Sequence, residues 1–161
     1  MPQLLGRGPK ATMRVPSAPS RARPVVLATL SVRVDPAAER MALESALEAR
    51  TKLIIANMLF LPSYPATVTL AREYATLPHE EDLEAVRATA QRAAALGIQT
   101  ELLRISSRRP VKSLLELVRE REAGLLVFGP DLRRTSRLRF WLTARVVREQ
   151  AGCLVWIAPD G

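Results

Sequence analysis

From residue 24 onward, short and mostly apolar runs alternate with longer segments in which apolar residues recur at helical spacing. An unbroken apolar run of this length is typical of a parallel strand that is buried on both faces. The alternation therefore predicts an open parallel α/β sheet with right-handed crossover helices. The third run mixes polar and apolar residues more than the others, which predicts a sheet edge. The five predicted strands are 25–30 (VVLATL), 52–61 (KLIIANMLFL), 98–105 (IQTELLRI), 124–129 (GLLVFG) and 153–158 (CLVWIA).

The segments between the strands carry signals for helix starts and stops. Asp35 followed by Pro36 is an N-cap with proline at the first helical position, which predicts a helix to about residue 49. Acidic residues at 80–84 suit the positive end of a helix dipole, and Gly97 suits the end of that helix. Pro110 starts a third helix. In such a sheet, ligands bind beyond the carboxyl ends of the strands, where the strand order reverses.

The N-terminal segment differs from the rest of the chain in composition. Residues 1–23 hold four of the 12 prolines and five basic residues but no acidic one, out of a net charge of +8. Its scattered apolar residues cannot bury enough surface to offset the entropy of ordering, so we expect a disordered basic tail over residues 1–22. The folded domain should span 23–161. A quiet extension, an electrostatic arm for nucleic acid or anionic lipid, and a targeting peptide remain open as roles for the tail.

Composition excludes several classes of protein. A single cysteine, Cys153, excludes a disulfide framework within the chain and a cysteine-based zinc site, and a single histidine, His79, excludes a multi-histidine metal centre. The longest nearly apolar stretch, Leu53 to Pro62, has ten residues, whereas a membrane helix needs about 20. No nucleophile elbow, Walker loop or dinucleotide-binding glycine motif follows a predicted strand. We therefore expect a cytoplasmic protein without a membrane span, without a metal and without catalytic residues.

Three segments in the last third of the chain resemble the universal stress protein family. Residues 106–115 (SSRRPVKSLL) resemble its strand end and the helix that follows, 122–129 (EAGLLVFG) its fourth strand, and 151–157 (AGCLVWI) its closing strand. The resemblance covers about residues 24–159. It implies a five-stranded parallel sheet of order 3-2-1-4-5 with helices on both faces, an adenine-nucleotide alpha-hydrolase-like fold. It also implies a homodimer that pairs through the last strand, residues 153–158.

The family's nucleotide-binding members carry glycine-x-x-glycine, nine further residues, and then glycine followed by serine or threonine. Such glycines let backbone N–H groups curl round a phosphate, and the hydroxyl adds a donor at a helix N-terminus. Two of the three glycines are absent here, and Leu30 stands where nucleotide binders end the first strand with aspartate. The resemblance is therefore to members without a tight ATP site. The four motif positions hold Gly129, Leu132, Leu142 and Thr143.

The loop after the fourth predicted strand leaves a nucleotide-binding alternative open. Residues 130–139 (PDLRRTSRLR) hold four arginines beside a helix start, and guanidinium groups bind phosphate bidentately. In this alternative, ATP with magnesium is held by Gly129, Arg133, Arg134 and Thr143. In the competing interpretation, the loop is a solvated basic segment with acidic partners across a dimer interface.

The start of the last helix is open as well. Ser136 is an N-cap by local pattern, with Leu138, Leu142 and Val146 on one face of the helix, whereas the family register starts the helix near Thr143.

From the sequence we expect a non-catalytic stress-response or regulatory protein that is homodimeric, holds no cofactor and has a possible protein partner. The first alternative is an ATP-binding switch. The second is a binder of nucleic acid or anionic surfaces driven by the tail, but aromatic residues are only 4% of the chain, so we expect no nucleic-acid partner.

Overall fold

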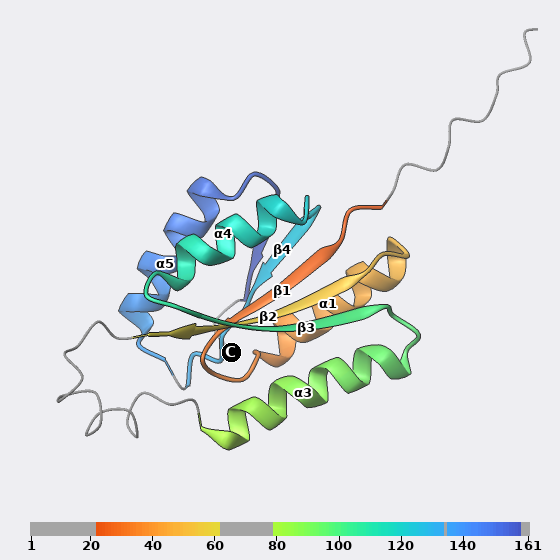
Figure 1. Ribbon diagram of the computed structural model, residues 1–161, viewed down its shortest axis with the longest axis horizontal. Helices are drawn as coiled ribbons and strands as arrows, with labels where there is room; N and C mark the ends of the chain where they lie inside the picture. Colours follow the sequence, from red (N-terminus) through yellow and green to blue (C-terminus); the bar gives the residue numbers. More distant parts are fainter. Residues whose placement is uncertain (1–21, 62–78, 134, 159–161) are drawn as a thin grey trace, which may run out of the picture.

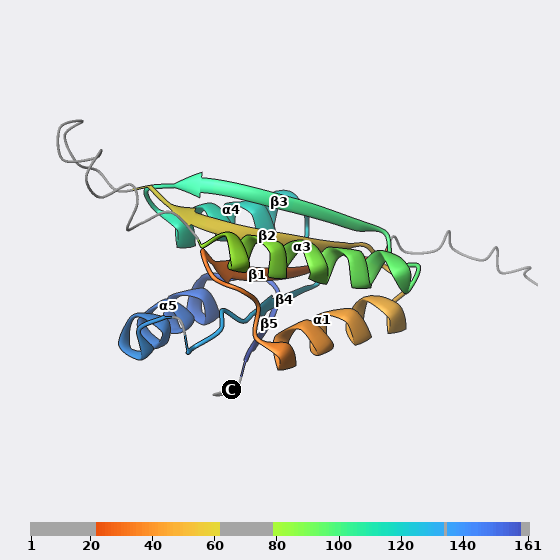
Figure 2. The same cartoon turned by 90° about the horizontal axis from the view of Figure 1, so that it is seen from below.

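The computed structural model describes residues 22–61, 79–133 and 135–158, and it contains one five-stranded parallel sheet of order β3-β2-β1-β4-β5. In Figure 2 the strands follow one another in this order from top to bottom. Both the α/β class and the strand order are as predicted. The elements are β1 (Val25–Leu30), α1 (Pro36–Glu48), β2 (Leu53–Phe60), α3 (Glu80–Ala95), β3 (Thr100–Ser107), α4 (Pro110–Glu120), β4 (Leu125–Phe128), α5 (Arg137–Gln150) and β5 (Leu154–Ile157).

Helices cover both faces of the sheet. One apolar cluster joins the strands to α4 and α5, and a second joins them to α1 and α3. Figure 1 shows α4 and α5 on one side of the strands and α3 on the other. Successive residues of β1 contribute to opposite clusters, since Val26 and Ala28 belong to the first and Val25 and Leu27 to the second. Burial on both faces explains why β1 and β2 are mostly apolar, with Thr29 and Asn57 as their polar residues.

The edge strand β3 differs from its prediction by two residues. The sequence predicted 98–105, but the strand runs from Thr100 to Ser107 because its last residues pair with Leu59 and Phe60 of β2. Its burial alternates along the strand, as expected of a sheet edge. Ile98 is buried just after Gly97, whose φ of 78° ends the preceding helix in the left-handed conformation that glycine adopts freely.

Helix α1 begins as the sequence predicts. The side chain of Asp35 accepts hydrogen bonds from the N–H groups of Ala37 and Ala38 at 2.8 and 3.3 Å, and Pro36 occupies the first turn. The helix face toward the sheet consists of small residues, which lets the helix axis approach the strands closely. These buried residues are Ala38, Ala42 and Ala46.

Two expectations concern residues that the structure does not describe. The tail, 1–22, lies outside the described residues except for Ala22, so its disorder stays a prediction. Arg134 lies outside them too. Within the described residues, no helix combines the length and hydropathy that crossing a bilayer requires.

Candidate functional site

The carboxyl ends of β1 and β2, the loop after β4 and the N-terminal parts of α4 and α5 surround a cleft of about 220 Å³. The strand order reverses at β1, which has β2 on one side and β4 on the other. This is the switch point at which ligands bind in open α/β sheets. The cleft is lined by Leu30, Ser31, Met58, Phe60, Pro110, Val111, Pro130, Thr135, Arg139, Phe140 and Thr143.

The lining of the cleft is mostly apolar with a few polar side chains. Leu30, the residue that replaces the family's aspartate, lines the cleft and offers no carboxylate to a ribose. Ser31, where the family has glycine, has a φ of 57°, so the backbone keeps the left-handed turn despite the side chain. The Ser31 hydroxyl donates to the carbonyl of Met58 at 3.2 Å, which ties the β1 end to β2. The polar groups left to face a ligand are Thr135, Arg139 and Thr143.

Gly129, the first position of the motif, is buried between the sheet and α1. Its N–H donates to the carbonyl of Ala28 at 3.1 Å, and its carbonyl accepts from the N–H of Asp35 at 2.9 Å. A Cβ at this position would lie 2.1 Å from the Cβ of Ala38. The glycine therefore permits close packing of α1 against the end of β4, and its N–H is already engaged. Sequence reasoning missed this contact, although the small residues on α1 were a signal for it.

The loop after β4 is held by backbone and side-chain hydrogen bonds at Asp131. Asp131 donates its N–H to the Arg33 carbonyl at 3.0 Å, and its side chain accepts from the N–H of Arg133 at 3.0 Å. Leu132, at the second motif position, packs against the apolar core rather than leaving room for a phosphate. Arg133 is exposed and does not line the cleft, whereas Arg139 does.

Helix α5 begins at Arg137 with Ser136 at the N-cap, so the local pattern predicted its start and the family register did not. The third motif position, Leu142, lies inside the helix with its side chain 60% exposed. Thr143 lines the cleft with its side chain. Because both residues lie beyond the first turn, their N–H groups are engaged within the helix and cannot bind a phosphate.

The remaining candidates do not converge. His79 is exposed at the N-cap of α3, by the carboxyl ends of the strands, whereas Cys153 precedes β5 at their opposite ends. Burial raises the pKa of the Cys153 thiol, and a backbone hydrogen bond at Leu126 lowers it by less. The thiol is therefore protonated at neutral pH, as expected of an inert cysteine. The described residues contain no group of three or more metal-ligating side chains.

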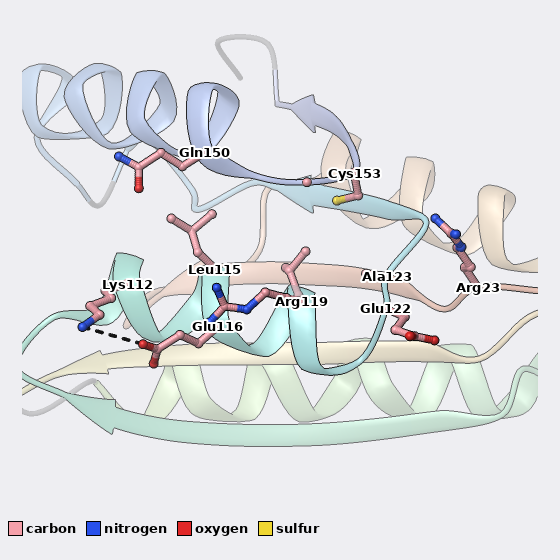
Figure 3. A pocket seen from close by; sticks show the side chains of 11 residues that line it. Arg23, Lys112, Leu115, Glu116, Arg119, Glu122, Ala123, Gln150 and Cys153 are labelled. Atoms are coloured by element: carbon pink, nitrogen blue, oxygen red, sulfur yellow. Dashed lines mark ion pairs between the residues drawn. The ribbon is translucent and has the colours of Figure 1, made fainter.

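A larger hollow of about 500 Å³ lies along α4, toward the N-terminal ends of β1, β4 and β5 (Figure 3). Its wall mixes both signs of charge, including Arg23, Arg119 and the Lys112–Glu116 pair at 3.8 Å. The Cys153 thiol also lines it. We place the candidate site at the smaller cleft because the carboxyl ends of the strands converge there.

Comparison with protein-family models shows to which family the chain belongs. The model of the universal stress protein family matches residues 22–159. The chain belongs to the universal stress protein family. No curated protein matches significantly. The sheet order, the switch-point cleft and the position of the degenerate motif are thus features of a universal stress protein fold.

Solved universal stress proteins share this fold. One, determined in complex with cAMP, is 26% identical, covers 88% of this chain and 100% of its own, and superposes with a TM-score of 0.62. UspA from Lactobacillus plantarum is 17% identical over 87% of this chain and 99% of its own, with a TM-score of 0.66. A protein from Archaeoglobus fulgidus in complex with dAMP is 18% identical over 86% and 98%, with a TM-score of 0.56. At these last two identities the likeness concerns the fold alone.

Proposed function

We propose that this universal stress protein is a non-catalytic regulatory protein of the cytoplasm, homodimeric through β5 and without a tight site for a nucleoside triphosphate. The proposal rests mainly on where the structure places the three residues at the glycine positions of the motif. Gly129 packs against α1, Leu132 packs against the core, and Leu142 lies inside α5. A triphosphate needs several free N–H donors, and the N–H groups of Gly129 and Leu142 are engaged.

A non-catalytic role is supported by the side chains that line the same cleft. Its polar side chains are hydroxyls and a guanidinium, from Ser31, Thr135, Thr143 and Arg139. General acid–base catalysis at neutral pH needs a group that titrates there, and nucleophilic catalysis needs an adjacent base. Among the described residues that line the cleft there is neither a carboxylate nor an imidazole. The cleft is therefore suited to binding rather than to turnover.

The dimer is supported by the edge strand β5. It lies at the end of the sheet, it carries no charged residue, and Leu154 at its start is 75% exposed. An edge strand with free backbone groups and no charge pairs readily with another strand. A second copy of β5 would extend the sheet across a two-fold axis, with the same patch on both protomers.

We expect Leu154→Lys to convert a dimer of the full chain into a folded monomer at micromolar concentration, because lysine on an edge strand opposes pairing. Sedimentation equilibrium measures the mass. Leu96→Lys is the matched control, since Leu96 is an exposed leucine (52%) remote from β5 and should leave the dimer intact. Circular dichroism checks that both variants fold. A monomeric wild-type protein would refute the homodimer.

A second candidate function is a nucleotide-binding switch. It is favoured by the switch-point cleft and by the cAMP and dAMP complexes of two solved relatives. The cleft, about 220 Å³, is smaller than the roughly 300–1,000 Å³ of most ligand sites. A mononucleotide is therefore a better match to this cleft than a nucleoside triphosphate. The arginine that lines the cleft is Arg139, so in this candidate Arg139 and Thr143 hold the phosphate instead of Arg133.

If the switch is correct, AMP or cAMP binds the full chain with saturable heat in calorimetry, and Arg139→Gln weakens binding about tenfold. That factor corresponds to losing one charge-assisted hydrogen bond. The control is Arg133→Gln, an exposed arginine outside the cleft that should leave the affinity unchanged. Equal effects of the two variants, or no saturation at millimolar ligand, would reject the cleft as a nucleotide site.

A further inference from the structure

The outer face of α5 carries a line of exposed apolar side chains. Leu138, Trp141, Leu142 and Val146 are 71%, 52%, 60% and 37% exposed, and we call these four residues the α5 stripe. They follow one another at i, i+3, i+4 and i+8, so they lie along one face of the helix. Four large apolar side chains together at a surface are unusual unless something covers them.

The α5 stripe points away from the sheet. Leu138 and Leu142 each lie two residues from Phe140, which is buried at 2% exposure against the core. Two residues turn an α-helix by about 200°, so the stripe is on the side opposite the buried one. Pairing of β5 with a second copy extends the sheet in its own plane and leaves this outer side free.

Basic residues surround the stripe on the same helix. The only acidic residue of α5 is Glu149, which accepts a hydrogen bond from Arg145 at 2.9 Å. A shallow hollow between α5 and the first turn of α4, lined by Val111, Leu115 and Val146, adds apolar surface and two more cations, Arg109 and Lys112. The basic residues of α5 are Arg137, Arg139, Arg145 and Arg148.

The charge decides which partner can cover the stripe. A symmetric contact between two copies of α5 would place eight arginines in one interface, and like charges at such a distance repel. The partner must therefore be anionic. A nucleic acid would satisfy the arginines through its phosphates but would leave the leucines and Trp141 in water. An acidic protein would need its charges on both sides of an apolar ridge.

We propose that the α5 stripe docks on an anionic lipid surface. Acyl chains take up the leucines and the indole of Trp141, and headgroup phosphates lie at the depth of the arginines, whose stems extend along the apolar layer. A helix face that carries a tryptophan and exposed leucines and is bordered by cations fits a surface that is charged everywhere. The four apolar residues of the stripe do not line the nucleotide cleft, whereas Arg139 borders both.

The test is co-sedimentation of the full chain with vesicles of phosphatidylglycerol and phosphatidylcholine in equal parts. The wild-type protein should bind these and not pure phosphatidylcholine, and binding should weaken with salt. Leu138→Ser with Leu142→Ser should lower the partition coefficient about tenfold or more, because both side chains lose their transfer into the lipid. The matched control is Leu47→Ser with Leu96→Ser, two exposed leucines on other helices, and it should bind like the wild type.

Tryptophan fluorescence gives a second readout of the same contact. In a Trp156→Phe background the emission comes from Trp141, and it should shift to shorter wavelength when anionic vesicles are added. Vesicle binding that survives the double leucine substitution would assign binding to the basic N-terminal segment and overturn the proposal. Binding to duplex DNA without binding to the vesicles, or no vesicle binding at all, would overturn it equally.

Discussion

Replacing Gly129 by alanine is expected to lower the free energy of unfolding by about 3 kcal/mol, the upper part of the range for overpacked cores. The added Cβ would lie 2.1 Å from the Cβ of Ala38, inside van der Waals contact, and 3.4 Å from the Cβ of Ala158. Neither the strand end nor α1 can move freely, because the backbone groups of Gly129 hold both Ala28 and Asp35. Denaturant unfolding measures the loss.

The cause of that loss can be isolated by a second substitution. Ala38→Gly removes the atom that the new methyl group meets, at a cost of about 1 kcal/mol for glycine in a helix. We therefore expect the double variant, Gly129→Ala with Ala38→Gly, to be more stable than Gly129→Ala alone. That coupling would identify close packing as the role of the glycine. Purely additive effects of the two substitutions would contradict it.

Phe140→Ala is expected to lower the free energy of unfolding by about 3–4 kcal/mol. Phe140 is buried at 2% exposure, and its ring stacks on that of Phe128 with centroids 5.8 Å apart. The pair joins α5 to β4 and thereby holds Arg139 and Thr143 at the cleft. Loss of Phe140 removes both the buried area and the support of the cleft wall.

The matched control is Phe60→Ala, which removes the same side chain from a position that is 53% exposed. We expect it to cost less than about 1 kcal/mol, since little of its area is withdrawn from water. Thermal or urea unfolding compares the two variants under one set of conditions. Similar losses would mean that α5 is not anchored through the Phe128–Phe140 stack.

The fold could be predicted from the sequence because its determinants are local. Helices on both faces of the sheet favour mostly apolar central strands, and β1 and β2 have that pattern. The start of α1 could be predicted for a similar reason: Asp35 and Pro36 satisfy the cap through bonds within three residues. The strand order came from family resemblance, since apolar patterning does not distinguish one arrangement of buried strands from another.

The candidate site was less predictable because its determinants are contacts distant in sequence. The role of Gly129 depends on Ala38, about 90 residues earlier. The motif register placed the helix start near Thr143, whereas the helix starts at Arg137, so Leu142 lies inside it. The four-residue spacing of Leu138, Leu142 and Val146 indicated one helix face. Only the burial of Phe140 on the other side of the helix shows that this face points outward.

The most direct test of the missing phosphate site is the thermal unfolding midpoint of the full chain with and without millimolar ATP and magnesium. A ligand present at 100 times its dissociation constant stabilises the native state by about 2.7 kcal/mol, which is about 5 °C or more for a domain of this size. Because the N–H groups at Gly129, Leu142 and Thr143 are engaged, we expect a shift of less than about 1 °C. A shift of several degrees that persists in moderate salt would contradict the absence of a tight triphosphate site.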